Sequence, residues 1–281
     1  MQSPEEIISG ALKSCLERAI RCDGIETVFQ PILDIRSGEL FAYEALARST
    51  FFFGRTSLMF ETAERLNLSW DLDAACRVAA LRSIALLAAS VQERSFFINV
   101  SPRSITDRRS IEGLTLSAMK ALGISQERIV IEVTETASIE DYKAFERQIS
   151  HYAEQGFRIA LDDFGSGHSG LLTLVAVAPH FIKLDRALVS HIDCDPYRQK
   201  LLSAVVTFAA NVGIELLGEG IERHEELETL RSLGVRYGQG FLLGRPMSLS
   251  VEQAGEDAIT SFATSASPQM ERPPAFASAG A

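Results

Sequence analysis

Short apolar runs alternate with helical patterns along the chain from about residue 25 to residue 243. Runs of β-branched or apolar residues bounded by turn signals are typical of strands, and their alternation with helices is typical of βα units around a parallel sheet. Eight runs meet this description and are expected to be strands: 26–34, 40–46, 96–100, 128–133, 157–161, 180–184, 213–217 and 234–237.

The connections between these strands predict how they are arranged. The sequence RSG between the first two runs indicates an antiparallel hairpin, whereas helical segments join the others. Eight strands in roughly 220 residues fit a (β/α)8 barrel of the TIM type with one antiparallel strand, whose functional site lies at the carboxyl ends of the strands. An open, doubly wound sheet is the alternative fold of the α/β class.

The two ends of the chain show different patterns. Apolar side chains at helical spacing predict a packing helix over residues 4–22. From about residue 262 the sequence is rich in Ala, Ser and Pro without periodicity, which is typical of a disordered tail. We therefore expect three parts: a helical lead-in at 1–24, one barrel domain at 25–261 and a tail at 262–281.

Composition narrows the class of protein. Hydrophobic residues make up 46% of the 281, enough for a packed core, and the net charge of −10 argues against binding of DNA through a basic surface. If the ligand is a polyanion, something other than surface charge must neutralise it. The four cysteines form no CxxC pair and no zinc spacing with the five histidines, which predicts buried free thiols in a reducing compartment.

No targeting segment is recognisable in the sequence. The start, MQSPEEIISG, has two acids and no basic region before an apolar core, unlike a secretory signal. The longest apolar run, about residues 78–91, contains Arg82 and is shorter than the roughly 20 residues that a membrane helix needs. A cytoplasmic protein with no membrane segment is expected.

The stretch ALDDFGSGHSG at residues 160–170 allows three interpretations. As a dinucleotide fingerprint, its glycines follow a strand and Asp185 lies about 20 residues further on, but Asp162 and Asp163 would face a pyrophosphate without a counterion. As a kinase DFG loop, it lacks the upstream glycine-rich and HRD motifs. The third interpretation, paired carboxylates at a strand end, predicts more oxygen ligands at the other strand ends.

Such residues do occur there. Glu44 lies inside the apolar run FAYEAL, where a carboxylate is unfavourable to bury unless it binds a cation or forms an ion pair. Asn99 ends FFINV, Glu132 lies in RIVIEV and Glu219 follows GIELLG. Five carboxylates and one amide at successive strand ends are difficult to obtain from capping preferences alone.

Each of these residues also has a simpler interpretation. Asn99 is a suitable turn residue before a proline, and Glu132 with Glu135 could be acids at a helix start. Glu219 and Glu222 could be charges at the N-terminus of the helix ERHEELETL. These alternatives stay open at this point.

All-oxygen ligands suit hard cations such as Mg²⁺ or Mn²⁺, and this many acids could hold two ions that share a bridging carboxylate. A two-metal site stabilises an in-line displacement at phosphorus and offsets phosphate charge. Lys183, in FIKLD, is the basic residue that a ring of strand ends brings in, either for catalysis or as an ion-pair partner of the acids.

Taken together, the motifs resemble the EAL-domain family of cyclic di-GMP phosphodiesterases. The matching stretches lie between about residues 28 and 247: FQPI, YEALAR, NVSP, EVTE, LDDFGSG, IKLD, GEGIE and QGFLLGRP. The resemblance implies that residues 25–261 form an EAL phosphodiesterase domain, that it hydrolyses cyclic di-GMP to linear pGpG with two Mg²⁺ or Mn²⁺ ions, and that it forms a homodimer.

The resemblance also implies a role for each matching residue. The metal ligands would be Glu44, Asn99, Glu132, the bridging Asp162, Asp163 and, in the outer shell, Gln239. The residues that position or deprotonate the attacking water would be Lys183 and Glu219. The residues near the guanine and phosphate groups would be Gln30, Arg48 and Asp185.

A loop follows the paired aspartates, and the resemblance places it near a dimer interface. It comprises Phe164, Gly165, Ser166 and Gly167 and would be braced by Glu135, whose carboxylate would accept hydrogen bonds from the loop amides. Our hypothesis is that Glu135 couples dimer geometry to metal occupancy and so contributes to catalysis.

Two other functions fit parts of the pattern. A receptor with the EAL fold would bind cyclic di-GMP or a partner protein without hydrolysing the nucleotide, and it would have no chemical need for a complete ligand set. A Rossmann-type oxidoreductase would bind a nicotinamide cofactor and would be insensitive to Mg²⁺ removal. The complete ligand set favours the enzyme.

Overall fold

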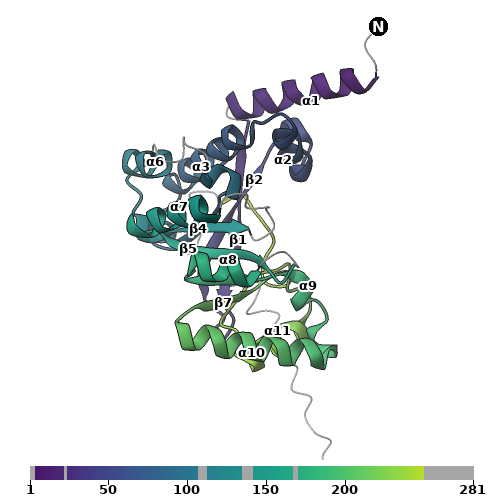
Figure 1. The fold of residues 1–281 in the computed structure, drawn as a ribbon, viewed down its shortest axis with the longest axis vertical. Helices are drawn as coiled ribbons and strands as arrows, with labels where there is room; N and C mark the ends of the chain where they lie inside the picture. Colours follow the sequence, from purple (N-terminus) through teal and green to yellow (C-terminus); the bar gives the residue numbers. More distant parts are fainter. Residues whose placement is uncertain (1–3, 22–23, 107–112, 135–141, 167–169, 250–281) are drawn as a thin grey trace, which may run out of the picture.

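The computed structural model describes residues 4–21, 24–106, 113–134, 142–166 and 170–249 (Figure 1). Within these residues, eight strands close into a barrel in sequence order. The strands are β1 (Glu26–Asp34), β2 (Leu40–Arg48), β3 (Ser95–Asn99), β4 (Ile129–Thr134), β5 (Arg158–Phe164), β6 (Phe181–Leu184), β7 (Glu215–Gly218) and β8 (Tyr237–Gly238). The expected barrel is confirmed, and the open doubly wound sheet is wrong.

One strand runs against the rest. β1 pairs antiparallel with both β2 and β8, and every other neighbouring pair is parallel. The turn after β1 explains the reversal: Asp34 Oδ1 accepts hydrogen bonds from the backbone amides of Arg36 and Ser37 at 3.0 and 3.3 Å, and Gly38 adopts φ 79°. The expected hairpin is therefore confirmed.

The last two strands begin later than the sequence predicted. Gly213 and Gly234, at the start of the expected runs, end the helices α10 (Pro196–Val212) and α11 (His224–Leu233) with φ angles of 74° and 97°. Left-handed glycines are common at helix C-termini because they have no Cβ to clash there. At each of these two glycines the backbone therefore ends a helix, whereas a strand was expected to begin there.

Helices fill the connections between the strands. They include α2 (Thr56–Arg65), α3 (Ser69–Ala85), α4 (Ala89–Gln92), α5 (Pro102–Thr106), α6 (Leu114–Leu122), α7 (Tyr142–Glu154), α8 (Gly170–Val177) and α9 (Arg186–Val189), with 3-10 turns at Thr50–Phe52, Gln126–Arg128 and Ile192–Cys194. Among the described helices, none is long and apolar enough to span a membrane.

The helix expected at residues 4–22 is observed as α1 (Pro4–Arg21), at the opposite end of the molecule from α10 and α11 (Figure 1). Its buried Leu16 and Ala19 share a small core with Phe52 and Met59. The tail expected at 262–281 lies outside the described residues. The division into three parts stays a prediction.

The interior of the barrel is built in layers, as the alternation of side chains along strands requires. An apolar layer takes one side chain from every strand: Ile32, Ala42, Phe97, Val130, Ala160, Phe181, Leu217 and Tyr237. Two positions along from each of these stands a polar residue, which in β1 precedes the apolar one because that strand is reversed. The polar layer therefore lies directly above the apolar one, at the carboxyl ends of the parallel strands.

Candidate active site

Lys183 of β6 occupies the centre of the polar layer and is 1% exposed. Its ammonium lies 2.7 Å from Glu132 Oε1, 2.8 Å from Glu219 Oε1, 3.0 Å from Asp162 Oδ1 and 3.6 Å from Glu44 Oε2. Among the described residues, one ammonium therefore faces four carboxylates. When all are ionised, three negative charges are in excess.

Burial and mutual repulsion shift the pKa values of this group. Burial alone would lower the pKa of Lys183, but the four carboxylates hold it well above its ordinary value. Complete burial, reinforced by the charge of Glu44, raises the pKa of Glu132 well above its ordinary value against the opposing effect of Lys183. Burial also raises the pKa of Glu219 to about 8, although Lys183 opposes the shift. The layer would be strongly stabilised by additional positive charge.

Two side-chain amides orient Glu44. Asn99 Nδ2 donates to Glu44 Oε1 at 3.0 Å, and Gln239 Nε2 donates to Glu44 Oε2 at 2.6 Å. Gln239 Nε2 also donates to Gln30 Oε1 at 3.0 Å, and Gln30 Nε2 donates to the carbonyl of Gly244. Because both amides use their nitrogens, the carbonyl oxygens of Asn99 and Gln239 are available to another partner.

The paired aspartates reach the same site because the strand is irregular. In a regular strand, adjacent side chains point to opposite faces. Asp163 instead has φ 56°, and the register of β5 against β6 shifts between Leu161 and Phe164. The amide of Asp163 donates to Asp162 Oδ1 at 3.0 Å, and oxygens of Asp162, Asp163 and Glu219 lie within 4.8 Å of one another.

These residues fit divalent cations. Glu132 Oε1 contacts the Lys183 ammonium, but within the described residues neither Glu132 Oε2 nor Oε1 of Gln239 has a hydrogen-bond partner, although both atoms are buried. Buried polar atoms normally have such partners, so each exception requires an explanation. A hard cation that accepts six or more oxygen ligands would provide one for this acidic, all-oxygen set.

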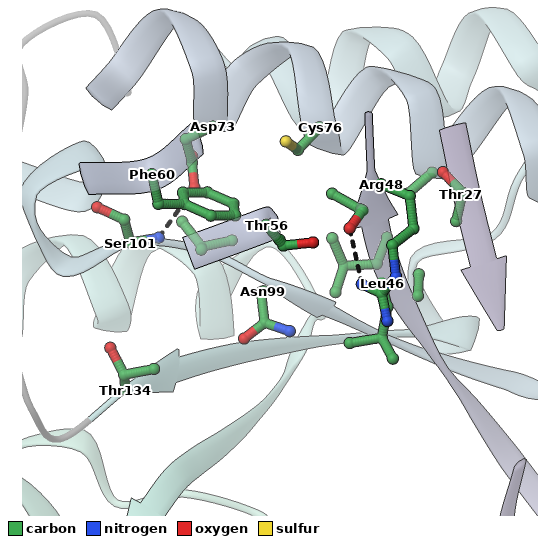
Figure 2. Close-up of a pocket in the computed structure, with 15 residues that line it drawn as sticks. Thr27, Leu46, Arg48, Thr56, Phe60, Asp73, Cys76, Asn99, Ser101 and Thr134 are labelled. Atoms are coloured by element: carbon green, nitrogen blue, oxygen red, sulfur yellow. Dashed lines mark hydrogen bonds between the residues drawn. The ribbon is translucent and has the colours of Figure 1, made fainter. Parts of the chain in front are cut away.

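Two cavities flank the polar layer, and Leu46 lines both. The first has a volume of about 270 Å³ and is lined in part by Arg48, Phe60 and Asn99 (Figure 2). The second, of about 310 Å³, is lined by Gln30, Glu44, Asp163, Asp185, Glu219 and Gln239, among others. A ligand with two similar halves could therefore occupy both cavities and present its centre to the carboxylates.

Arg48 and Asp185, which were expected to bind the nucleotide, line the first and the second cavity respectively. Arg48 NH1 donates to the carbonyl of Ala47, so the guanidinium is held at the first cavity. Asp185 lines the second cavity but also caps α9, where its Oδ1 accepts from the amide of Ala187 at 2.8 Å. A structural role therefore accompanies any binding role of Asp185.

The loop after Asp163 is described only in part. Phe164 packs against the core outside the barrel, and Gly165 adopts φ 99° close to Leu188. The amide of Ser166 donates to the carbonyl of Asp163 at 3.1 Å, which closes a turn. Glu135 and Gly167 lie outside the described residues, so the expected brace stays a prediction.

The simpler interpretation is wrong for Glu219, whereas Glu222 lies directly before Arg223, the residue that caps α11. Helix α11 begins only at His224. At its N-terminus, the carboxylate of Glu226 accepts hydrogen bonds from the backbone amides of Glu222 and Arg223. Glu222 pairs with Arg186 at 3.0 Å, and Glu219 contacts Lys183 instead.

Sequence reasoning missed one buried pair beside the site. Asp73 and Arg77 of α3 are 5% and 2% exposed and form an ion pair at 3.3 Å, and Asp73 lines the first cavity. The signal was present: an acid and an arginine four residues apart, DAACR, lie on one face of an apolar helix. Such pairs are common on helix surfaces, so burial could not be read from spacing.

The fold and site together define a TIM-type barrel with an acidic, oxygen-rich layer at the carboxyl ends of its strands. The sequence model of the EAL domain family matches residues 14–246. The chain therefore belongs to the EAL domain family, and the resemblance indicated by its motifs is confirmed.

Known relatives agree with this assignment. The chain is 30% identical over 240 residues to a cyclic di-GMP phosphodiesterase from Pseudomonas aeruginosa, covering 84% of this chain and 41% of that protein. It is 32% identical to a standalone EAL protein of Vibrio cholerae solved in a c-di-GMP-bound form, with a TM-score of 0.71 over 79% of this chain and 92% of that one.

A third comparison involves a metal ion. A calcium/cy-diGMP complex of BlrP1 from Klebsiella pneumoniae is 29% identical, with a TM-score of 0.73 over 80% of this chain and 56% of that one. The chain spans between 27% and 48% of the length of the curated relatives that it matches. What those longer proteins do as wholes is therefore a separate question from what this barrel does.

Proposed function

We propose that this chain is a metal-dependent phosphodiesterase that hydrolyses cyclic di-GMP to linear pGpG with two Mg²⁺ or Mn²⁺ ions. Relatives named as cyclic di-GMP phosphodiesterases support the reaction. Structures titled as c-di-GMP complexes with calcium or manganese support the ligand and the type of metal.

The observation that carries the proposal is the charge of the polar layer. Among the described residues, three buried carboxylates and the partly buried Glu219 converge on the ammonium of Lys183, and Asp163 adds a fifth acid that lines the second cavity. A site with this excess of negative charge would repel a phosphodiester unless cations were bound with it. Two divalent cations bound there would offset the phosphate charge and lower the pKa of an attacking water.

Six residues are proposed as the ligands of these ions. All six lie in or beside the polar layer and present oxygen atoms: Glu44, Asn99, Glu132, Asp162, Asp163 and Gln239. Asp162 would suit a bridging position because its carboxylate contacts Lys183 at 3.0 Å and has an oxygen within 4.8 Å of oxygens of Asp163 and Glu219. Gln239, which holds Glu44, would act from the outer shell.

Lys183 and Glu219 are proposed to handle the attacking water. The Glu219 carboxylate is 18% exposed and lines the second cavity, so it can reach a water and accept its proton. Lys183 holds the carboxylate in place at 2.8 Å. In the reaction, the water oxygen bonds to phosphorus, the bond from phosphorus to the sugar O3′ breaks, and O3′ takes up a proton.

The two cavities are proposed to bind the two halves of the nucleotide. Arg48 suits a phosphate or a guanine edge, because a guanidinium donates two parallel hydrogen bonds. Gln30 and Asp185 face the second cavity and would contact the other half.

The loop of Phe164, Gly165, Ser166 and Gly167, braced by Glu135, is proposed to couple a homodimer to metal binding. If Glu135→Ala changed neither the Mg²⁺ dependence of hydrolysis nor the order of this loop, that coupling would be abandoned.

The test is to incubate the purified protein with cyclic di-GMP and separate the nucleotides by chromatography. We expect pGpG with Mg²⁺ or Mn²⁺, none with EDTA, and little with Ca²⁺, whose longer bonds and flexible geometry activate water poorly. Hydrolysis that persists in EDTA would contradict the proposal. Nucleotide binding without product in every metal would indicate the receptor instead.

A further inference from the structure

Asp73 and Arg77 form a buried ion pair that the proposed chemistry does not use. They lie four residues apart on α3, outside the barrel, and are almost completely buried. Burial of two charges is unfavourable, and replacing such a pair by apolar residues of similar volume is often neutral or stabilising. Packing of α3 alone therefore does not explain the pair.

Asp73 contacts the loop that follows Asn99, the last residue of β3. Asp73 Oδ1 accepts a hydrogen bond of 3.0 Å from the backbone amide of Ser101, two residues beyond Asn99 (Figure 2). On the other side, the amide of Val100 donates to the carbonyl of Glu132 at 2.8 Å. The two consecutive amides after Asn99 are thus fixed from different elements, one from α3 and one from β4.

Arg77 extends this anchor to a second helix, α7. Its NH1 donates to the hydroxyl of Tyr152 on α7 at 3.3 Å, and its NH2 holds Asp73 Oδ2 at 3.3 Å. Within the turn itself, Ser101 Oγ accepts from the amide of Ser104. Asp73 is therefore itself held in place and can act as a fixed acceptor for the loop.

We propose that Asp73 is a positioning residue for Asn99: through the amide of Ser101 it fixes the loop so that Asn99 can donate to Glu44 and present its carbonyl oxygen to an ion. The inference rests on the proposed function, because it requires that Asn99 ligates a metal. Groups that orient metal ligands typically change metal affinity by about 10- to 100-fold when mutated. Since Asn99 is not the bridging ligand, the effect should fall on one ion of the two.

Two double variants isolate the hydrogen bond from the ion pair. Asp73→Leu/Arg77→Met and Asp73→Asn/Arg77→Met both remove the two charges and the contact with Tyr152. Only the second keeps a side-chain oxygen that can accept from Ser101. Because neither leaves an unpaired buried charge, both are designed to fold, and circular dichroism and thermal unfolding would establish this before binding is measured.

The measurement is Mn²⁺ binding by calorimetry with the full chain, without nucleotide. We expect the leucine variant to bind one of two ions about tenfold more weakly, with the asparagine variant within about threefold of the wild type. Hydrolysis should show the same order through the Mn²⁺ concentration needed for half-maximal rate. Equal Mn²⁺ affinities in the two variants, or equal loss at both ion sites, would overturn the inference. If the wild type itself bound no Mn²⁺ and made no pGpG, the proposed function would have failed instead.

Discussion

The two layers inside the barrel come from the same strands, two residues apart, yet they are stabilised in opposite ways. In the apolar layer, the ring centroids of Phe97 and Phe181 lie 5.2 Å apart in an edge-to-face contact. Phe41 packs against this layer and stacks on Tyr237 with a centroid distance of 4.0 Å, so the layer is stabilised by apolar and aromatic packing. In the polar layer, carboxylates crowd around Lys183 and raise one another's pKa values. The apolar layer stabilises the fold, and the polar layer carries an excess of negative charge that a bound cation would offset.

This difference shows how a barrel supports chemistry. The apolar layer closes the barrel beneath the polar layer, and two cavities formed by described residues adjoin the polar layer. Because packing in the apolar layer already fixes the positions of the strands, the barrel can accommodate repulsion among the carboxylates of the polar layer. Neutralising a carboxylate of the polar layer should therefore reduce activity more than stability, and a substitution in the apolar layer should do the reverse.

The sharpest test compares Glu132 and Val130 on the same strand. Glu132→Gln removes a buried charge at a proposed ligand, and we expect hydrolysis to fall on the order of 10³-fold, equivalent to about 4 kcal/mol of barrier. Val130→Ala, in the layer below, should lower the free energy of unfolding by about 2 kcal/mol with little effect on hydrolysis at saturating Mg²⁺. Initial rates and denaturant titrations would measure the two effects, and equal activity losses would show that the layers are not distinct.

Lys183→Met sharpens the comparison within the polar layer. Without the ammonium, we expect hydrolysis to fall about 10²-fold, and the metal-free protein to lose about 3 kcal/mol of stability because buried carboxylates lose their counter-charge. Mg²⁺ should then raise the melting temperature of the variant more than that of the wild type. A smaller rise in the variant would mean that cations do not replace the charge of Lys183.

Phe41→Ala tests the apolar layer. Loss of the stacked contact with Tyr237 should lower the free energy of unfolding by about 3 kcal/mol. Hydrolysis by the folded fraction at saturating Mg²⁺ should stay within about twofold of the wild type. If activity disappeared while circular dichroism showed a folded barrel, the apolar layer would be part of the chemistry.

Stability and Mn²⁺ affinity should both change gradually with pH. In the metal-free protein the pKa of Glu219 is raised from 4.5 to about 8, so the folded state holds a proton that the unfolded state has lost. Its contribution to stability is complete below pH 4.5 and is lost as the pH rises through about 8. Because cation binding displaces that proton, Mn²⁺ affinity should rise with pH over the same window, by at most about tenfold per unit. A flat affinity in calorimetry from pH 5 to 8 would contradict this.

Much of the fold was predictable because local patterns determine it. All eight strands were expected, although β2 and β5 extend further than expected. The last two strands begin late because Gly213 and Gly234 end helices, and a turn glycine marks a boundary without saying which element it closes. Acids at strand ends predicted the polar layer because parallel strands bring those ends together. The sequence alone did not predict the positive φ of Asp163 or the contact of Asp73 with Ser101, because both depend on tertiary packing.

Anomalous X-ray diffraction from crystals soaked with Mn²⁺ and cyclic di-GMP tests the central claim most directly. We predict two manganese peaks at the carboxyl end of the barrel, bridged by Asp162 and surrounded by Glu44, Asn99, Glu132 and Asp163. Peaks elsewhere on the surface, or an empty polar layer under bound nucleotide, would contradict the account.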